Sequence, residues 1–403
     1  MEKKDKNLNV PNLRFPEFSG EWGKATLQSV ATVSKGAGIS KDQLSEEGQP
    51  CILYGELYTK YNSEIIDTII SKTDIDSEKL VRSQANDVII PCSGESAVDI
   101  ATARCVKQSN VLLGGDLNII RLKGEHDGSF FAYQLNGRRK YDIAKVAQGV
   151  SVVHLYGEHL KRVKVNYPSA TEQKKISSLL ALIDQRIETQ KKIIEKYESL
   201  IRGIVETHYS QCECIRQVRI SELGEPFTTM NMSKEDLSEE GNECILYGEL
   251  FTTYGCVIKE VKSRTHISTD KATISRSNDM LFPASTTVDA ISLIAPSAIC
   301  KEGVILGGDL FGIHVNKDYN NEYLSYLINY IYKSKLARYA QGSTIIHLHY
   351  SDIKKATLLL PTIEEQNFLA YLMRGVEEKI NIEKDMLSQL YRQKAYLLSS
   401  LFI

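Results

Sequence analysis

Short apolar runs alternate with turn residues along the first part of the chain, and the same alternation returns in its second half. Residues 51–54 and 244–247 are apolar runs that follow a glycine-containing turn, and 88–91 and 280–283 are apolar runs that end at a proline. Apolar runs of this length between turn signals are typical of buried strands. We therefore predict a buried strand at each of these four places.

A helical period follows the Gly-Gly-Asp-Leu turns at 114–117 and 307–310. Over 323–340 the apolar side chains recur with a period of 3.6 and fall near one face of a helix. These apolar residues are Leu324, Leu327, Ile328, Ile331 and Leu336. The stretch 131–147 is a weaker copy of the same pattern, so one helix is predicted in each half.

A longer helix is predicted to start just after a proline in each half. Ser169 with Glu172, and Thr362 with Glu365, have the capping-box spacing, in which the hydroxyl accepts from a free helix N–H and the glutamate reaches back. From there the apolar positions alternate steps of three and four, which is typical of a coiled-coil seam. The first seam is Leu180, Ile183, Ile187, Gln190, Ile194, Tyr197, Ile201 and Ile204. The second seam is Met373, Val376, Ile380, Glu383, Leu387, Leu390, Lys394 and Leu397.

The two long helices are expected to pair antiparallel as a coiled coil, under an approximate two-fold axis. The alternative is that each helix packs only on its own domain. The polar seam residues Gln190 and Glu383 fall at equivalent positions. Polar residues at such positions either fix the register of the pair or mark a place where the seam opens.

The chain is an internal duplication. Residues 40–59 and 233–252 are identical at 15 of 20 positions, at an offset of 193, and the offset returns in the Gln-Gly pairs at 148–149 and 341–342. A repeat this long is a domain rather than a turn of a solenoid. We expect an α/β (α+β) chain of two similar domains separated by the long helices. The predicted divisions are 1–168 (domain 1 with an N-terminal arm), 169–210 (central helix), 211–361 (domain 2) and 362–403 (C-terminal helix).

Charge and cysteine usage narrow the class of protein. The formal net charge is −2 over 403 residues, which argues against a lone, strongly basic nucleic-acid binder but permits local basic patches. Eight cysteines form no Cys-x-x-Cys pair, and Cys212 with Cys214 has the wrong spacing for zinc. The N-terminus lacks the apolar stretch of a secretory signal, and no run is long enough to span a membrane. We expect reduced thiols and a cytoplasmic protein without a metal site.

Motifs for catalysis are absent from the sequence. It contains no Gly-x-x-x-x-Gly-Lys-Ser/Thr phosphate loop, no His-Glu-x-x-His and no Gly-x-Ser-x-Gly. No Pro-Pro dipeptide occurs, which removes the Asp/Asn-Pro-Pro-aromatic site expected of an amino-methyltransferase. We therefore predict no catalytic residue and no cofactor in this chain. The alternative, a stand-alone DNA methyltransferase or nuclease, is disfavoured.

Paired histidines and aspartates recur in both halves. His154 and His347 follow the Gln-Gly pairs, where they would either contact DNA or cap a loop. Asp116 and Asp309 follow Gly-Gly and look like candidate acids, but turn residues that bond nearby backbone amides are the simpler interpretation.

Serines and glutamates recur in the same way. Ser93 and Ser285 follow strand ends, but a nucleophile needs a partnered base and the sequence shows none. Glu56 and Glu249, in the Tyr-Gly-Glu-Leu runs, would either accept from a cytosine amino group or pair with a lysine.

Three features resemble Type I restriction-modification specificity subunits. The opening 11–18, Pro-Asn-Leu-Arg-Phe-Pro-Glu-Phe, is followed by Gly-Glu-Trp at 20–22. The Gln-Gly…His-Leu stretches end at 155 and 348, and both long helices start with Pro-x-x-x-Glu-Gln. The resemblance covers nearly the whole chain, and the duplicated order of these motifs is specific.

The resemblance implies a DNA-specificity subunit with two target-recognition domains and two spacer helices. It implies that two methyltransferase subunits bind this chain and carry S-adenosylmethionine, and that motor-nuclease subunits, with ATP and Mg²⁺, complete the restriction complex. The target would be double-stranded DNA with two short half-sites separated by an unspecified gap, the spacing fixed by the rigid separation of two readers. The similarity of the two domains leads to the hypothesis that the half-sites are related, as in a near-palindrome.

Candidate DNA-contacting residues are polar or basic and cluster in predicted loops, where phosphate contacts and base readout are made. In the first half they are Lys35, Tyr58, Thr59, Lys60, Ser93, Lys107, Gln148, Ser151 and His154. In the second half they are Thr228, Thr252, Thr253, Tyr254, Ser285, Gln341, Ser343, Thr344 and His347.

Overall fold

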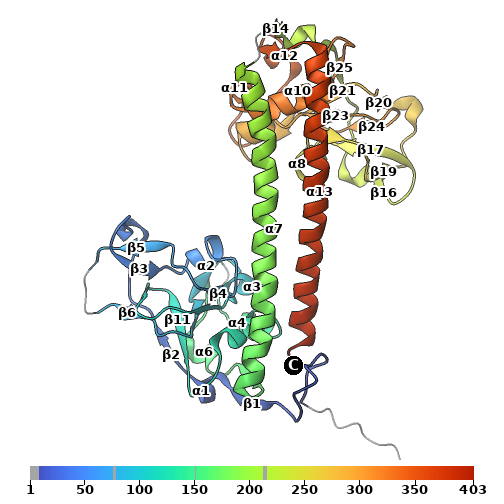
Figure 1. Ribbon diagram of the computed structural model, residues 1–403. Helices are drawn as coiled ribbons and strands as arrows, with labels where there is room; N and C mark the ends of the chain where they lie inside the picture. Colours follow the sequence, from blue (N-terminus) through green and yellow to red (C-terminus); the bar gives the residue numbers. More distant parts are fainter. Residues whose placement is uncertain (1–8, 76–78, 150, 212–215) are drawn as a thin grey trace, which may run out of the picture. The chain divides into compact units, whose positions relative to one another are not determined.

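A computed structural model of the chain describes residues 9–75, 79–149, 151–211 and 216–403 (Figure 1). It divides into two compact units. Unit 1 is Met1–Lys191 together with Asp385–Ile403, and unit 2 is Lys192–Lys384. The long helices α7 (Ala170–Gln211) and α13 (Ile363–Ser400) each contribute to both units. The predicted division was a division of the sequence into two domains and two separate helices. In the structure, each compact unit also contains a part of both helices.

Unit 1 is built on two sheets. The five-stranded sheet has the order β2-β11-β7-β9-β4 and the four-stranded sheet the order β5-β3-β10-β6. The first sheet comprises β2 (Ala31–Lys35), β11 (Leu117–Leu122), β7 (Asp87–Pro91), β9 (Arg104–Val106) and β4 (Ile65–Ile66). The second comprises β5 (Ser71–Thr73), β3 (Gln49–Ile52), β10 (Leu112–Leu113) and β6 (Val81–Arg82). Two-stranded ladders join β1 (Gly23–Thr26) to β13 (Lys164–Tyr167) and β8 (Ser93–Gly94) to β12 (Val153–His154).

Unit 2 repeats this topology. Its sheets have the orders β15-β25-β21-β23-β18 and β16-β19-β17-β24-β20. The first comprises β15 (Gly224–Thr228), β25 (Leu310–Val315), β21 (Asp279–Pro283), β23 (Ser297–Ile299) and β18 (Val257–Ile258). The second comprises β16 (Leu237–Ser238), β19 (Ser263–Thr265), β17 (Asn242–Leu246), β24 (Ile305–Gly307) and β20 (Thr273–Ile274). The ladders pair β14 (Arg216–Arg219) with β27 (Thr357–Leu360) and β22 (Ser285–Thr286) with β26 (Ile346–His347). All four predicted buried strands are present, as β3, β7, β17 and β21.

The medium-length helices are present but broken. In unit 1, α4 (Gly128–Asn136) ends at Gly137 and α5 (Lys140–Ala144) follows. In unit 2, α10 (Asn321–Leu327) runs into a π-helical turn (Ile328–Tyr332), α11 (Lys333–Leu336) and a 3₁₀ turn (Ala337–Tyr339). The predicted helices 131–147 and 323–340 therefore lie where they were expected, but each is interrupted rather than continuous.

The remaining helices are single turns that join strands. In unit 1 they are α1 (Leu27–Val30), a 3₁₀ turn (Lys41–Gln43), α2 (Glu56–Thr59), α3 (Ala97–Ile100) and α6 (Gly157–Leu160). In unit 2 they are 3₁₀ turns (Ile220–Glu222, Lys234–Asp236, Thr269–Lys271), α8 (Glu249–Thr252), α9 (Ala290–Leu293) and α12 (Tyr350–Ile353).

The starts of α7 and α13 differ, although their sequences predict the same cap. The α13 box is reciprocal, because Thr362 N donates to Glu365 Oε2 (3.1 Å) and Glu365 N donates to Thr362 Oγ1 (3.4 Å). At α7, Glu172 N still donates to the Ser169 hydroxyl, but the glutamate does not reach back. Its carboxylate instead accepts two hydrogen bonds from Arg14, at 2.8 Å each. The predicted reciprocal box was wrong at α7, because an arginine outcompetes a backbone amide for this carboxylate.

The glutamine that follows each glutamate fastens the helix start to the unit. Gln173 Oε1 accepts from Asp127 N (3.0 Å), while its amide donates to Pro168 O (2.9 Å). Gln366 makes the same pair of bonds to Asn320 N and Pro361 O. Both glutamines are buried, so an unpaired amide here would be costly. The Pro-x-x-x-Glu-Gln motif thus has a structural role in both units.

The long helices contact each other within each unit. In unit 1, Lys394 of α13 pairs with Asp184 of α7, and the Lys191 ammonium lies over the Tyr391 ring, so the two segments run antiparallel. In unit 2, Lys384 of α13 pairs with Glu198 of α7. The buried seam residues are Leu180, Ile183, Ile187, Gln190, Ile194, Ile201, Met373, Ile380, Leu390 and Leu397, as the heptad pattern predicts.

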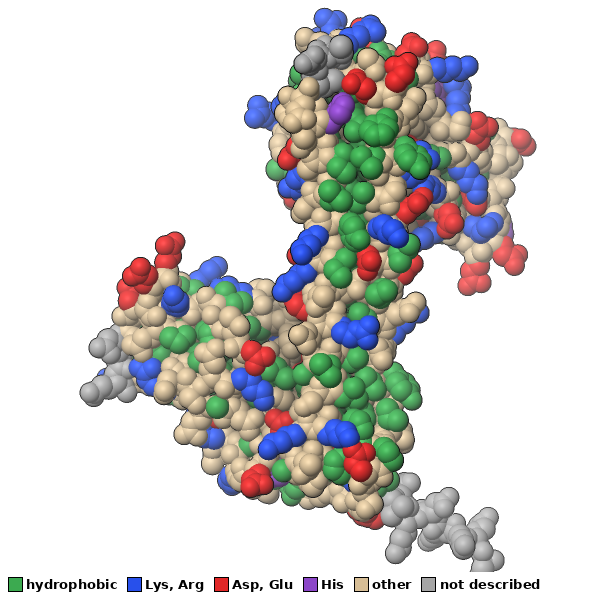
Figure 2. All heavy atoms as spheres, in the orientation of Figure 1, with side chains coloured by type: hydrophobic (Ala, Val, Ile, Leu, Met, Phe, Trp, Pro, Cys, Tyr) green, Lys and Arg blue, Asp and Glu red, His purple; other side chains and the backbone are tan. Residues whose placement is uncertain are grey.

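The outward faces of the long helices carry large apolar side chains, and Figure 2 shows hydrophobic groups gathered over these helices. In unit 1 the exposed residues are Leu182, Met386, Tyr391 and Tyr396. In unit 2 they are Leu200, Phe368, Tyr371, Leu372 and Ile382. Contiguous exposed apolar surface on a folded protein marks an interaction site more often than isolated apolar residues do.

Candidate nucleic-acid interface

A short hairpin presents the Gln-Gly…His-Leu motif in unit 1. Backbone hydrogen bonds run both ways between Gln148 and His154, from His154 N to Gln148 O (2.7 Å) and from Gln148 N to His154 O (2.9 Å). Gly149 has φ +125°, and a Cβ there would lie 2.1 Å from the carbonyl oxygen of Val152. Only glycine fits, which explains the Gln-Gly pair. We call residues 148–154 the unit 1 hairpin.

The ladder β8–β12 joins this hairpin to Ser93, which lies opposite His154. The Ser93 hydroxyl is 3.2 Å from Asp116 Oδ2, to which it donates, and 3.3 Å from His154 Nδ1. The Tyr58 hydroxyl donates to the Ser93 carbonyl oxygen (3.2 Å). The structure therefore links Tyr58, Ser93, Gln148 and His154, four of the candidate DNA contacts, by hydrogen bonds, while their role in binding stays a prediction.

The order of these groups differs from that of a nucleophilic triad. In such a triad the histidine lies between serine and acid, whereas here Ser93 lies between Asp116 and His154. Asp116 has φ +57°, a backbone conformation found at tight turns. Asp116 thus lies in a turn, as predicted, but its carboxylate accepts a hydrogen bond from the Ser93 hydroxyl, where a bond from a backbone amide was expected.

Unit 2 carries the same hairpin at residues 341–347. Ser285 lies opposite His347 in the β22–β26 ladder, and Gln341 and His347 exchange backbone hydrogen bonds of 2.9 and 2.7 Å. Gly342 has φ +121° and the same lack of room for a Cβ. Phe251 replaces Tyr58, so the hydroxyl contact to the serine is a feature of unit 1.

The tips of both hairpins are exposed. Val152 is 53% exposed and Ile345 is 49% exposed, at equivalent positions. The predicted residues Ser151, Ser343 and Thr344 beside them are also exposed. Each hairpin thus offers hydroxyls for hydrogen bonding and one branched apolar group, which is the chemistry that reads base edges and thymine methyls in a DNA groove.

A cavity of about 1,110 Å³ adjoins the unit 2 hairpin. Two predicted residues, Thr252 and Ser285, line it, and Ile345 of the hairpin reaches its edge. Asp309 also lines it. The predicted Thr228 lies on the exposed strand β15 and Thr253 directly after α8, both outside this lining.

Three predicted residues are engaged elsewhere. The Lys60 ammonium bonds Glu56 Oε1 and the Ser71 hydroxyl, each at 2.7 Å. Lys107 pairs with Asp127 at 3.7 Å.

The third is Tyr254, whose ring packs against the unit 2 core and whose hydroxyl accepts from Lys262 N (3.0 Å). Lys35 is exposed on β2, and Thr59 donates to the Gly55 carbonyl within α2. The assignment of these residues as DNA contacts remains a prediction.

The Tyr-Gly-Glu-Leu glutamates hold their own turns. Glu56 accepts from Leu53 N (2.9 Å) and pairs with Lys60. Glu249 accepts from Leu246 N (2.8 Å) and from the Ser263 hydroxyl (2.6 Å). The lysine-pairing interpretation is confirmed for Glu56, while Glu249 is bonded to a backbone amide and a serine hydroxyl.

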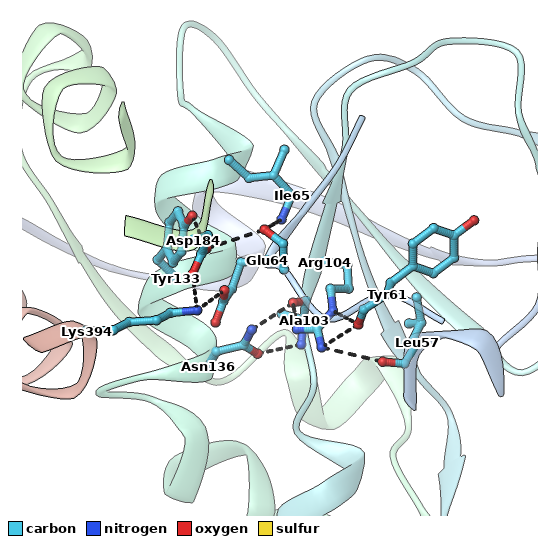
Figure 3. Close-up of polar contacts among 11 residues, drawn as sticks. Leu57, Tyr61, Glu64, Ile65, Ala103, Arg104, Tyr133, Asn136, Asp184 and Lys394 are labelled. Carbon is cyan, nitrogen blue, oxygen red and sulfur yellow. Dashed lines mark hydrogen bonds and ion pairs between the residues drawn. The ribbon is translucent and has the colours of Figure 1, made fainter. Parts of the chain in front are cut away.

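A buried charge cluster in unit 1 supports the segment that carries Tyr58 (Figure 3). Lys394 of α13 reaches Glu64 and Asp184, at 2.6 Å each, and the Tyr133 hydroxyl donates to Asp184 (2.6 Å). Burial alone would lower the pKa of Lys394, but the two carboxylates raise it overall. Below this cluster Arg104 donates to the carbonyl oxygens of Tyr61 and Leu57, which fixes the end of α2.

Unit 2 has a different cluster in the same place. Backbone pairing puts Cys256 where unit 1 has Glu64, because Ala298 N donates to Cys256 O as Cys105 N donates to Glu64 O. Glu377 takes the role of Asp184 and accepts from the Tyr326 hydroxyl. The seam position of Lys394 is occupied by Ile201, which is buried.

We expect Glu377→Gln to stabilise unit 2 progressively as the pH rises from 4 to 7. Burial raises the pKa of Glu377, which the hydrogen bond from Tyr326 only partly offsets. A carboxyl whose pKa is higher in the folded state stabilises that state below its unfolded pKa, and loses this contribution as the pH rises through the folded pKa. Thermal unfolding of both proteins across this pH range measures the difference.

Glu378→Gln is the matched control. Glu378 is exposed, and a hydrogen bond and charge from Lys259 lower its pKa, so its removal should not stabilise the protein as the pH rises. A Glu377→Gln effect of the same size at every pH would contradict the expectation.

Metal and membrane features were sought in the described part of the chain. It holds no group of three or more His, Cys, Asp or Glu residues placed to bind a metal ion. Its six described cysteines are free, while Cys212 and Cys214 lie outside the described residues. Among the described helices, none combines the length and apolarity needed to cross a bilayer.

Both halves of the chain match one protein family. Residues 19–199 and 216–392 each match the Type I restriction modification DNA specificity domain. The chain belongs to this family. It is a type I restriction-modification specificity chain with two specificity domains, one in each half.

Similar proteins agree over the full length. The putative type I restriction enzyme MjaX specificity subunit of Methanocaldococcus jannaschii is 21% identical, over 98% of this chain and 96% of that protein. The type I restriction-modification S subunit from M. genitalium has the same fold, with a TM-score of 0.62, 17% identity and coverage of 98% and 99%. A structure from work on assembly and conformational transition of the type I R-M system has a TM-score of 0.51, 12% identity and coverage of 94% and 97%.

Proposed function

We propose that each specificity domain reads one half of a bipartite DNA target through its hairpin, and that the chain itself catalyses no reaction. The observation that carries this proposal is the repetition of one hairpin with an exposed tip in both units. Ser93 opposite His154 and Ser285 opposite His347 are held by the same ladder beside the same glycine turn. Two readers on one chain suit a target of two short half-sites.

The hairpin tips are the parts of this surface that are suited to a DNA groove. Ser151 and Thr344 supply hydroxyls, and Val152 and Ile345 supply apolar contact of the kind made with a thymine methyl. Gln148, His154, Gln341 and His347 lie at the hairpin bases, where they would contact sugar or phosphate. Phosphate contacts place the reader on the duplex, while base contacts specify the sequence.

Partner subunits would supply the chemistry. The exposed apolar side chains of α7 and α13, such as Tyr371 and Tyr396, offer docking surface for the two methyltransferase subunits that the family resemblance implies. S-adenosylmethionine would belong to those subunits, and ATP and Mg²⁺ to the motor-nuclease subunits. The complex would work in the cytoplasm, on double-stranded DNA.

Single-molecule methylome sequencing tests the proposal. Cells that produce the chain with its methyltransferase partner should carry a split methylated motif, which disappears when this chain alone is deleted and returns on complementation. The reason is that the partner depends on the chain to find its sites. An unchanged methylome after deletion, with the methyltransferase shown to be active, would contradict the proposal.

A hairpin variant links the motif to the surface described above. Ser151→Ala with Val152→Ala removes the tip contacts but keeps Gly149 and the backbone bonds of the hairpin. Each lost base contact typically costs about 1–3 kcal/mol of discrimination, so methylation should lose selectivity in one half-site only.

A further inference from the structure

The cavity beside the unit 2 hairpin has two lysines in its lining that the sequence did not single out. Lys234 and Lys333 line it, together with Thr252 and Ser285. In the part of the chain that the structure describes, no carboxylate lies within 4 Å of either ammonium group. The cavity therefore presents two ammonium groups that form no close ion pair, together with several hydroxyls.

Two carboxylates, those of Glu249 and Asp309, share this lining with the lysines. Glu249 is engaged with Leu246 N and the Ser263 hydroxyl. Asp309 lies at the turn that corresponds to Asp116. A further carboxylate, Asp289, lies close enough to Lys333 for the lysine charge to contribute to lowering the pKa of Asp289.

Lys333 follows an unusual backbone feature. The π-helical turn Ile328–Tyr332 ends directly before it, and π-helical turns are rare and found mostly at functional sites. Such a turn inserts extra backbone and rotates the residues that follow about the helix axis. Unit 1 breaks its helix at the same place, at Gly137, and begins the next helix at Lys140, 193 positions before Lys333. Both units thus interrupt a helix and resume it at a lysine.

The neighbouring Lys335 lies in the same short helix as Lys333 but does not line the cavity. Its ammonium lies 4.8 Å from the centre of the Tyr332 ring, and it is not part of the cavity lining. Lys335 is therefore a matched control, two residues away in the same short helix.

We propose that this cavity seats the phosphodiester backbone of a DNA strand, with Lys333 and Lys234 as phosphate contacts. The inference rests on the proposed function, because it places the strand whose bases the unit 2 hairpin reads. Ile345 connects the two parts, since it is exposed on the hairpin and also lines the cavity. A strand leaving the hairpin tip would meet the lysines and the Ser285 and Thr252 hydroxyls next.

The test measures binding of the complex of this chain with its methyltransferase subunits to a labelled duplex that carries the methylome motif, over a range of salt concentrations. A phosphate contact releases counterions, so Lys333→Ala should reduce affinity several-fold at low salt and reduce the slope of log affinity against log salt by about 0.9. The double variant Lys234→Ala/Lys333→Ala should reduce the slope by about 1.8. Lys335→Ala should leave both affinity and slope unchanged.

The outcomes separate the two proposals. If the wild-type complex binds its motif and Lys333→Ala behaves like Lys335→Ala, the proposed phosphate contacts are wrong, while the proposed recognition of DNA by the hairpins stands. If the wild-type complex shows no preference for its motif, the proposed function itself fails. Equal thermal unfolding of the variants excludes loss of folding as the cause of weaker binding.

Discussion

Replacing Lys394 with alanine should destabilise unit 1 by about 3–5 kcal/mol, the usual cost of removing one partner from a buried ionic group. Lys394 is only 14% exposed and is the shared cation of Glu64 and Asp184, which are 8% and 9% exposed. Without it, two carboxylates would remain close together in a buried site. Their mutual repulsion and desolvation would act on the segment between α2 and β4, beside the Tyr58 surface.

The single tryptophan makes this measurement selective. Trp22 is buried in unit 1, where its ring packs against Phe130, so its fluorescence follows unfolding of this unit. Chemical denaturation should show an earlier transition for Lys394→Ala. Lys161→Ala is the control, because Lys161 and Glu158 form an exposed pair within unit 1 whose loss should barely shift the transition. Equal midpoints for the two variants would contradict the expected result.

The equivalent residues of unit 2 suggest a second substitution that would restore the stability lost in Lys394→Ala. The double variant Glu64→Cys/Lys394→Ile copies the residues found at Cys256 and Ile201. It should recover much of the stability lost in Lys394→Ala, because replacing a buried ionic group by packed apolar residues is often close to neutral. Asp184 would keep the hydrogen bond from Tyr133, as Glu377 keeps that from Tyr326.

The two half-sites of the methylated motif should share bases. The hairpins hold identical groups at their bases and differ at four positions between them. Ser151 against Thr344, Val152 against Ile345 and Val153 against Ile346 differ by one methyl or methylene, while valine 150 corresponds to Ser343. Similar side chains in similar backbone frames present similar hydrogen-bond and apolar patterns to a groove. Half-sites in related but not identical form, arranged as a near-palindrome around the gap, follow from this.

The methylome of the wild-type strain decides this question. Ser151→Thr with Val152→Ile makes the first hairpin tip resemble the second, so the first half-site should shift toward the second. Half-sites with no bases in common, or a double variant that leaves the motif unchanged, would count against the relationship. The exchange is conservative in volume and exposed, so the folding of unit 1 should not change.

Much of the fold is predictable from the sequence because its signals are local and repeated. The apolar runs of β7 and β21, the seam residues and the duplication all follow from spacing. The breaks in the medium helices were missed, because the apolar period continues through Ile328 and Ile331 across the π-helical turn. Leu324, Leu327, Ile328 and Ile331 fit a 3.6-residue period without an interruption, so the pattern gave no sign of the π-helical turn.

The candidate binding surface was only partly predictable, because the sequence does not show which side chains contact each other in the fold. The Gln-Gly and histidine signals fall on the two hairpins, and their assignment as DNA contacts stays a prediction. Sequence alone could not separate Lys60, which bonds Glu56, from Lys333, which lines the cavity. Nor could it place Arg14 on Glu172, since these residues are 158 positions apart. Such pairings depend on tertiary structure, which also explains the polar Lys394 in an otherwise apolar seam.

Unit 1 is assembled from both ends of the sequence, and this fixes an order of events during synthesis on the ribosome. Leu13 N donates to Ser400 O (2.9 Å), and Phe402 packs against Phe130 in the unit 1 core. Unit 2 is one continuous stretch, Lys192–Lys384. All residues of unit 2 are translated before the segment Asp385–Ile403, which completes unit 1. Unit 2 can therefore fold while unit 1, although most of it is translated earlier, still lacks the C-terminal residues that cover part of its core.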